Sequence, residues 1–285
     1  MVRRFPALLA VFALFLAAAL PALARAQDEE GVLPGARVLA YYGFPGNPNM
    51  GILGEYDPDE LLARLEDQAA AYEAADPDRP LVLAFEVIAT VAQPNPGDDG
   101  TFTLGIDEET LQQYADYTAE RDMLLFLDVQ IGRDSVANQI DFVRPFLELP
   151  HVHLAIDPEF AIAEGETPGQ ELGSLDASAI TEAQEILAAL AEEQGIPPKI
   201  LIVHQFNVFM ISNKEQIEPV PGVQLVIDAD GFGTPEEKRA SYEVVITDSE
   251  IEFNGFKLFY QQDEPLMTAE DVLALDPAPD VVIYQ

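Results

Sequence analysis

Apolar runs with the character of β-strands alternate with helical stretches along most of the chain. The expected strands cover residues 37–42, 81–91, 123–129, 152–156, 199–204, 224–228, 255–260 and 281–284. The expected helices cover residues 57–75, 107–121, 135–147, 177–193 and 268–275, with a further one beginning at residue 234. Most strands are continuous apolar runs, which is typical of parallel strands buried on both faces.

Eight such cycles predict an α/β protein with a single (β/α)8 barrel of the TIM type over residues 27–285. The last strand ends the chain, so the eighth helix is expected to be absent. An open doubly wound sheet is the alternative, and it requires a glycine-rich phosphate loop directly before the first helix. The segment Gly43-Phe-Pro-Gly46 is interrupted by proline and does not open into a helix, which favours the barrel.

Polar residues follow the apolar runs at the ends of successive strands, which is where the active sites of such barrels lie. They are Asp128, Gln130, Asp157, Glu159, His204, Gln205, Asn207, Asp228, Asp230, Asp263 and Glu264, and Glu86 lies within the apolar run of the second strand. Four of them, Asp228, Asp230, Asp263 and Glu264, fit equally well as caps of the helices that follow. His151 and His153 stand near the start of a strand, at the opposite end of the barrel, and are expected to be structural.

The alternation of side chains along a strand predicts which residues point into the barrel. It groups Asp128 with Gln130, Asp157 with Glu159, and Lys257 with Phe259, Gln261 and Asp263. Burying the charge of Lys257 or of Glu86 alone is costly, so these two side chains are expected to pair. The Asp157 carboxylate is expected to raise the pKa of Glu159 and keep it protonated.

The first 26 residues have the three parts of a secretory signal peptide: Arg3 and Arg4, an apolar stretch from Ala7 to Leu20, and small residues around Ala24. The mature protein is therefore expected to be secreted and not to associate with the membrane. The alternative is that this segment is retained as an N-terminal anchor. The chain has no cysteine, so a lipid anchor on cysteine and disulfide bonds are both excluded.

The formal net charge is −37, with 51 acidic and 14 basic residues. Such a field repels nucleic acid and anionic lipid, and it favours neutral or cationic ligands. Without cysteine, with three histidines and without a Gly-x-Ser-x-Gly motif, the chain lacks the residues of a thiol enzyme, a histidine-rich zinc site or an α/β-hydrolase. Carboxylate chemistry remains, and no cofactor is predicted.

The Asp157-Pro-Glu159 segment resembles the end of the fourth strand in chitinase-type barrels, which carries Asp-x-Asp-x-Glu. The first acid of that motif is Ala155 here. A wider resemblance rests on YYGFPGNPNMGILGE, FEVIATVA, LDVQIGR, LAIDPEF, VHQFN, DADGFGT and FYQQDEPLM. These blocks are similar to those of a largely uncharacterised family of secreted bacterial proteins and lipoproteins. The resemblance implies an exported barrel with a site at its rim.

The first hypothesis is an extracellular glycoside hydrolase-like enzyme that acts on a polysaccharide or cell-envelope glycan with a pair of carboxylates. Glu159 would be the general acid/base, Asp157 its neighbour, and Glu86 or Asp128 the second carboxylate. The expected substrate-binding residues are Tyr41, Tyr42, Gln130, His204, Gln205, Asn207, Asp228, Lys257, Tyr260 and Asp263. The alternatives are a non-catalytic glycan- or ligand-binding protein and a hydrolase that binds a hard cation through Asp128, Asp157, Glu159 and Asp228.

Overall fold

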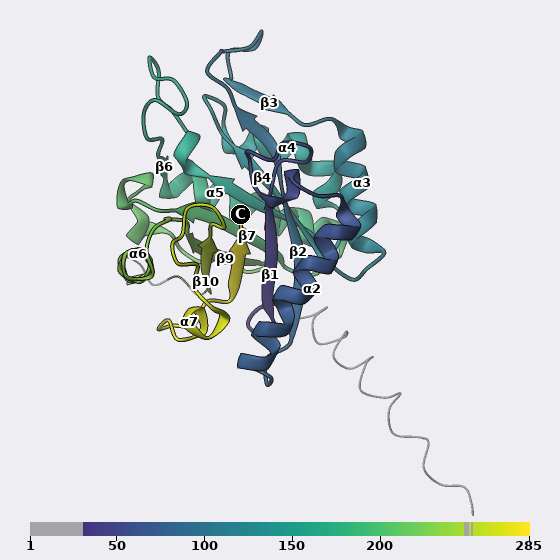
Figure 1. Cartoon of the computed structure of the whole chain (residues 1–285). Coiled ribbons are helices and arrows are strands. Elements are labelled where there is room, and N and C mark those ends of the chain that lie inside the picture. Colours follow the sequence, from purple (N-terminus) through teal and green to yellow (C-terminus); the bar gives the residue numbers. More distant parts are fainter. Residues whose placement is uncertain (1–30, 248–250, 252) are drawn as a thin grey trace, which may run out of the picture.

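Eight parallel strands close into a barrel in the computed structural model, which describes residues 31–247, 251 and 253–285 (Figure 1). They are β1 (Arg37–Gly43), β2 (Leu81–Ala92), β4 (Leu124–Gln130), β5 (Val152–Asp157), β7 (Lys199–Gln205), β9 (Val223–Ala229), β10 (Phe253–Leu258) and β11 (Val281–Tyr284). Strand β1 pairs in parallel with both β2 and β11, which closes the ring. The predicted (β/α)8 barrel is confirmed.

Helices follow six of the eight barrel strands and pack around the barrel, whereas the segment between β7 and β9 contains no α-helix. They are α2 (Pro58–Ala75), α3 (Glu108–Ala119), α4 (Val136–Leu147), α5 (Ala177–Gln194), α6 (Pro235–Thr247) and α7 (Ala269–Leu273). Helix α2 begins where the sequence predicts, because the Asp57 carboxylate accepts a hydrogen bond from the Glu60 N–H at 3.0 Å and Pro58 occupies the first helical position. A reciprocal cap between Thr268 and Asp271 starts α7 in the same way.

Several short elements on the loops were not predicted. Strand β3 (Thr103–Gly105) pairs antiparallel with the end of β2, and β6 (Leu175–Asp176) pairs with β8 (Ile211–Ser212). Single 3-10 turns are η1 (Ile52–Gly54), η2 (Pro158–Phe160), η3 (Val208–Met210) and η4 (Lys214–Gln216). These pieces are too short to show a hydrophobic period, which is why the sequence did not indicate them.

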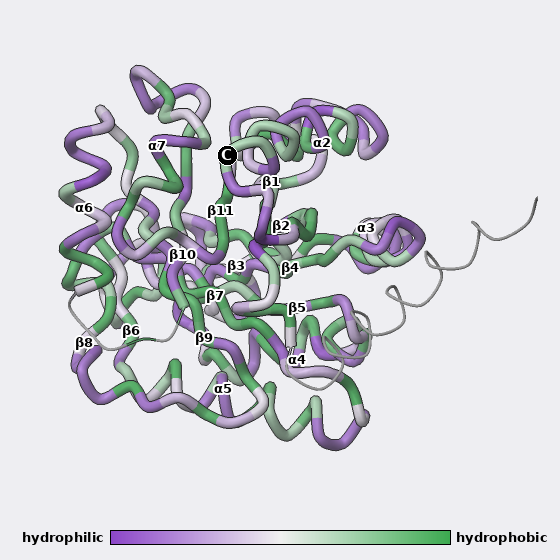
Figure 2. Tube along the Cα trace, turned by 90° about the horizontal axis from the view of Figure 1, so that it is seen from below, coloured by the Kyte–Doolittle hydropathy of each residue, from purple (hydrophilic) through white to green (hydrophobic). Residues whose placement is uncertain are grey.

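Side chains on the two faces of the strands form two separate apolar layers. The outward layer packs against the helices and includes Leu125, Leu154 and Val203. The inward layer fills the barrel and includes Phe126, Ala155 and Ile202. In Figure 2 the strand segments are largely hydrophobic, whereas the surrounding helices have mixed colours. The alternation read from the sequence therefore assigns the inward positions of these strands correctly.

Strand β11 is the last element of the described residues. Four tyrosines cluster beside the outward faces of β1 and β11. Tyr72 and Tyr284 share a hydrogen bond of 2.8 Å between their hydroxyls, and Tyr41 and Tyr260 share one of 3.3 Å. The Tyr260 ring stacks on Tyr284 with centroids 5.3 Å apart. Tyrosine side chains therefore join β1, β11 and α2 on this side of the barrel.

The described chain begins beneath the barrel, at the end opposite to the predicted site. The Gln224 side chain accepts hydrogen bonds from the Val32 and Leu33 N–H groups, both at 3.1 Å, and Leu33 packs into the inward apolar layer. The predicted signal peptide, residues 1–26, lies outside the described residues. Within the described part, no helix is long and apolar enough to cross a membrane.

Candidate active site

A cavity of ≈ 570 Å³ opens at the C-terminal ends of the barrel strands. Its charged lining consists of Asp157, Glu159, Asp230, Glu237 and Lys257. Its aromatic and polar lining includes Tyr42, Asn49, Gln130, Phe160, Phe206, Phe232, Ser241, Phe259 and Gln285. The strands bring these residues together from widely separated parts of the sequence, at the rim where the sequence predicts a site.

Glu159 lies at the wall of this cavity, on the turn that follows β5. The strand ends at Asp157, and the Asp157 carboxylate accepts a hydrogen bond from the Glu159 N–H at 3.0 Å. The prediction that both acids share one strand face was therefore wrong, because Pro158 has no N–H to continue the ladder and the chain turns into η2. Asp157 orients the turn that carries Glu159.

Burial raises the pKa of Glu159, and the negative charge of Asp230 raises it further. The neighbour that raises this pKa is thus Asp230 rather than Asp157, which corrects the sequence-based expectation. Asp157 is 4% exposed, and its own pKa lies well above the usual range because of burial and the nearby charge of Asp128. Two carboxyl groups at the cavity therefore retain their protons to a higher pH than ordinary acids.

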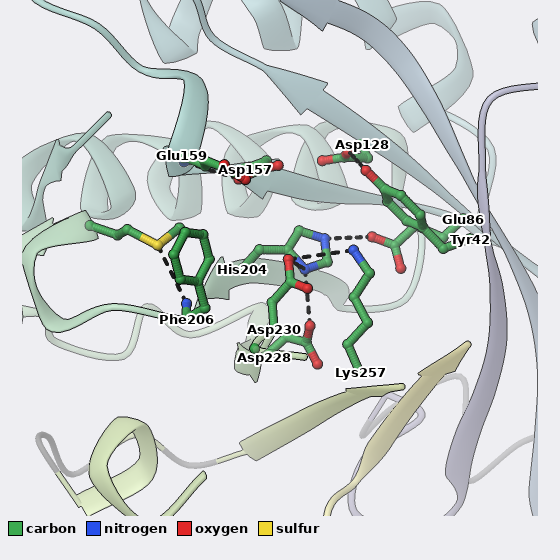
Figure 3. A network of polar contacts seen from close by, with 12 residues as sticks. Tyr42, Glu86, Asp128, Asp157, Glu159, His204, Phe206, Asp228, Asp230 and Lys257 are labelled. Atoms are coloured by element: carbon green, nitrogen blue, oxygen red, sulfur yellow. Dashed lines mark hydrogen bonds and ion pairs between the residues drawn. The ribbon is translucent and has the colours of Figure 1, made fainter. Parts of the chain in front are cut away.

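Behind the cavity lies a buried network around His204, shown in the middle of Figure 3. His204 Nε2 is 2.8 Å from Glu86 Oε1, and Nδ1 is 3.0 Å from Asp228 Oδ2. All three side chains are fully buried. Burial lowers the pKa of His204, but the adjacent carboxylates outweigh it and the pKa lies well above 6.5. The two neighbouring carboxyl groups therefore favour the protonated form of the ring.

Lys257 is the only basic side chain that lines the described cavity. Its Nζ is 3.4 Å from Asp230 Oδ2 and 3.6 Å from the centre of the Tyr42 ring. The expected pair with Glu86 was therefore wrong as a direct contact, since Glu86 is hydrogen-bonded to His204. Asp230 and Tyr42 hold the ammonium group at the cavity wall by charge and by a cation–π contact.

Tyr42 also connects the cavity to Asp128. Its hydroxyl donates a hydrogen bond to Asp128 Oδ2 at 2.9 Å. Asp128 is fully buried, and burial raises its pKa to about 6 although His204 and Lys257 oppose the shift. Neither Asp128 nor Glu86 lines the cavity, so both act behind the surface that a ligand would touch.

Replacing Asp128 by asparagine is expected to stabilise the protein above pH 6 and to leave it unchanged near pH 4. The folded-state pKa is about 6 against 3.8 when exposed, so stability falls as the pH rises between these values. The full cost is up to about 3 kcal/mol, and asparagine avoids it while still accepting the Tyr42 hydrogen bond. Urea denaturation at both pH values measures the difference. The exposed Asp78→Asn variant is the control, and equal effects of the two variants would contradict this reading.

The other predicted binding residues are distributed between three environments. Gln130 lines the cavity and accepts a hydrogen bond from the Ala92 N–H at 2.8 Å. Gln205 is fully buried and donates to the Asn207 carbonyl at 3.2 Å, while the Asn207 side chain caps η3. His204 and Asp228 belong to the buried network described above, without exposure to the cavity.

Four predicted or grouped residues lie away from the cavity. Tyr41 and Tyr260 line a separate surface pocket beside α2, because Tyr41 follows the outward alternation of β1. Gln261 lies in the same pocket, since β10 already ends at Leu258. Asp263 joins two loops: its carboxylate accepts hydrogen bonds from the Gly233 and Phe259 N–H groups, both at 2.9 Å, and lies 3.1 Å from Lys238 Nζ.

Two kinds of residue at the cavity were missed. Asp230 is among the polar residues that the sequence places at the rim, but it is not among the predicted catalytic or binding residues, because it fits equally well as a helix cap. The loop aromatics Phe206 and Phe232 and the helix residue Glu237 had no such signal. Loop conformation, which no short-range pattern determines, brings them to the cavity.

Two groups of described side chains have the spacing to hold a metal ion: Glu86, Asp128 and His204, and His204, Asp228 and Asp230. In both groups the His204 nitrogen is already within hydrogen-bond distance of a carboxylate, so an ion would have to displace the ring proton. Lys257 already places a positive charge beside Asp230. The metal ligands expected from the sequence were Asp128, Asp157, Glu159 and Asp228. Two of them, Asp157 and Glu159, are in neither group.

We expect dialysis against a strong chelator to leave the melting temperature and any activity of the protein unchanged. The reason is that His204 and Lys257 already supply positive charge to the buried carboxylates. Differential scanning calorimetry before and after dialysis provides the measurement. A lower melting temperature that added Mg²⁺, Ca²⁺ or Zn²⁺ restores would instead identify a metal site.

Comparisons with known proteins show only a limited likeness. No family model matches the chain, and no curated protein matches it. Among solved structures, the YdhT protein from Bacillus subtilis is 10% identical, with a TM-score of 0.42, over 88% of this chain and 81% of that one. D-allulose 3-epimerase from Methylomonas sp. is 11% identical, with a TM-score of 0.38, over 87% and 84%. A D-psicose 3-epimerase has 11% identity and a TM-score of 0.34, over 76% and 78%. Likeness at this level says nothing about substrate or reaction.

Proposed function

We propose that the protein is a secreted enzyme that hydrolyses glycosidic bonds, with Glu159 as the general acid. The observation that carries this proposal is the position of Glu159: it lines the open cavity, and burial and the Asp230 charge raise its pKa. A carboxyl group that remains protonated and touches the ligand can protonate the oxygen of a leaving sugar.

Asp230 is the second carboxylate of this proposal. It lines the same cavity; burial raises its pKa, and the positive charges of Lys257 and His204 offset that shift only in part. The contact with Lys257 Nζ at 3.4 Å is the feature that favours its ionised form in this proposal. An ionised carboxylate opposite a protonated one is the arrangement that glycoside hydrolysis requires. Asp230 therefore replaces Glu86 and Asp128 in this role, because those two side chains are fully buried behind the cavity.

The remaining walls fit a sugar. Aromatic side chains from several loops, including Phe206, Phe232 and Phe259, offer faces on which a sugar ring can pack. Asn49, Gln130 and Ser241 provide hydrogen-bonding groups beside them. An apolar cavity with a few polar groups is typical of small-molecule sites. The volume of ≈ 570 Å³ lies in the range of such sites, about 300–1,000 Å³.

The experiment that tests this proposal is a panel of soluble polysaccharides and cell-wall glycans incubated with the purified mature protein. We expect new reducing ends from at least one glycan, and none with the Glu159→Gln variant. Binding by calorimetry without release of reducing ends would support a non-catalytic glycan-binding protein instead. Secretion is part of the proposal and rests on residues 1–26; N-terminal sequencing of protein from the culture medium tests it separately.

A further inference from the structure

Carboxyl groups outnumber cationic groups at the cavity. Four line it, from Asp157, Glu159, Asp230 and Glu237, whereas Lys257 is its only ammonium group. Burial raises the pKa of Asp157 and Glu159, so these two contribute less negative charge than Glu237. That ammonium is already paired, since Lys257 Nζ lies 3.4 Å from Asp230. The Glu237 carboxylate is exposed, and hydrogen bonds from Thr234 lower its pKa, so it is ionised at the mouth of the cavity. A ligand that carries a negative charge would be repelled here.

One acceptor at the cavity lacks a partner. Asp230 Oδ1 has no hydrogen-bond donor among the described residues, although the side chain is only 9% exposed and lines the cavity. A buried carboxylate oxygen without a donor is costly, and a charged N–H group satisfies it best. This oxygen is closed to solvent, so a ligand ammonium group removes this cost only when the Asp230 carboxylate turns it toward the cavity.

The aromatic walls are compatible with a second ammonium group. Lys257 Nζ lies 3.6 Å from the centre of the Tyr42 ring and 5.5 Å from that of Phe259. Phe160, Phe206 and Phe232 line the same cavity and contact no such cation in the described residues. Aromatic rings next to carboxylates are a general means of binding amines.

We propose that the sugar unit held in this cavity carries a free amino group, so that the preferred glycan is cationic. The ammonium group of the ligand is held by Asp230 and Glu237 and faces the phenylalanine walls. The net charge of −37 concentrates such polymers near the protein at low salt. The amine preference follows from the cavity itself; only the choice of a sugar as its carrier rests on the proposed hydrolase function.

The test compares two glucosamine oligomers of equal length, one fully N-acetylated and one fully de-N-acetylated, at a pH below the pKa of the amine. Calorimetry with the Glu159→Gln variant measures binding without turnover. We expect the de-N-acetylated oligomer to bind at least about tenfold more tightly, with a difference that shrinks as salt is added. Equal binding, tighter binding of the acetylated oligomer, or binding of neither would overturn the inference.

Two neighbouring glutamates on α6 provide a matched pair of variants in the same background. Glu237→Gln removes a carboxylate from the cavity, whereas Glu236→Gln removes the same charge from an exposed position outside it. We expect only Glu237→Gln to reduce the preference for the amine; equal effects of both would reduce the proposal to a general effect of net charge and overturn it.

The native protein separates this inference from the proposed reaction. Preferential binding of the amine oligomer without cleavage of any glycan would support the inference while the hydrolase proposal fails. Cleavage of acetylated or neutral glycans in preference to the amine glycan would support the hydrolase and overturn the inference.

Discussion

Glu159→Gln is expected to lower kcat on a natural glycan by about 10²–10⁴-fold, the usual contribution of a general acid. Glutamine has nearly the shape of glutamate but no proton to give to the leaving oxygen. The loss should be much smaller for a substrate whose leaving group is already a stable anion, such as a dinitrophenyl glycoside, because that group needs no acid. Steady-state kinetics on both substrates provide the measurement.

The pH profile gives a second readout. Burial and the Asp230 charge raise the pKa of Glu159, so activity should persist above the usual titration range of a glutamate and fall once the proton is lost. This fall at higher pH should disappear in the Glu159→Gln variant with the activated substrate. Glu164→Gln, an exposed change outside the cavity, is the control. Full activity of the Glu159→Gln variant on the natural glycan would rule out the assignment.

His204→Leu is expected to destabilise the protein by about 3–5 kcal/mol at pH 7, the usual effect of removing one partner of a buried ion pair. The change leaves the fully buried Glu86 and Asp228 without their cation. The folded-state pKa of His204 lies well above 6.5, so its contribution is complete below pH 6.5 and is lost only as the pH rises through that higher value. Wild type therefore retains much of this stability at pH 7.

Chemical denaturation of the wild type and of the His204→Leu variant measures the loss of unfolding free energy. This loss should become smaller as the pH rises through the folded-state pKa of His204, because the wild-type ring then loses its charge. His151→Leu is the control, because His151 lies 3.0 Å from the Ala115 carbonyl without a carboxylate partner, and a loss of about 1 kcal/mol is expected for one hydrogen bond. Equal losses in the two variants, or a His204→Leu loss that does not depend on pH, would contradict the charged state of His204.

Local pattern was sufficient for the barrel strands and their inward faces. Runs such as Leu124–Gln130 and Val152–Asp157 are buried on both sides, so they are apolar throughout except where a polar residue is needed at the rim. The strict alternation of a strand then places Asp128, Asp157 and Lys257 toward the barrel axis. The same alternation does not predict side-chain direction beyond the strand ends, because turns do not keep a period of two. Glu159, Gln261 and Asp263 show this.

Pairings between the rim residues could not be read from the sequence. Alternation alone would allow Lys257 to contact several carboxylates. In the structure Lys257 lies beside Asp230, and Glu86 is hydrogen-bonded to His204 instead. Tyr41 and Tyr42 are neighbours in the chain, yet only Tyr42 enters the cavity, and Tyr41 joins the tyrosines beside β11. Such choices depend on how eight strands are staggered around the ring, which is a property of the closed barrel.

Local period and composition are enough to establish the class of fold and the end of the barrel at which polar residues, most of them carboxylates, gather. Which carboxylates line the cavity and which are buried behind it depends on the closed barrel. Burial and the distance between charges determine the pKa of each acid. Both arise when residues far apart in the chain meet, as Glu159 and Asp230 do at one cavity.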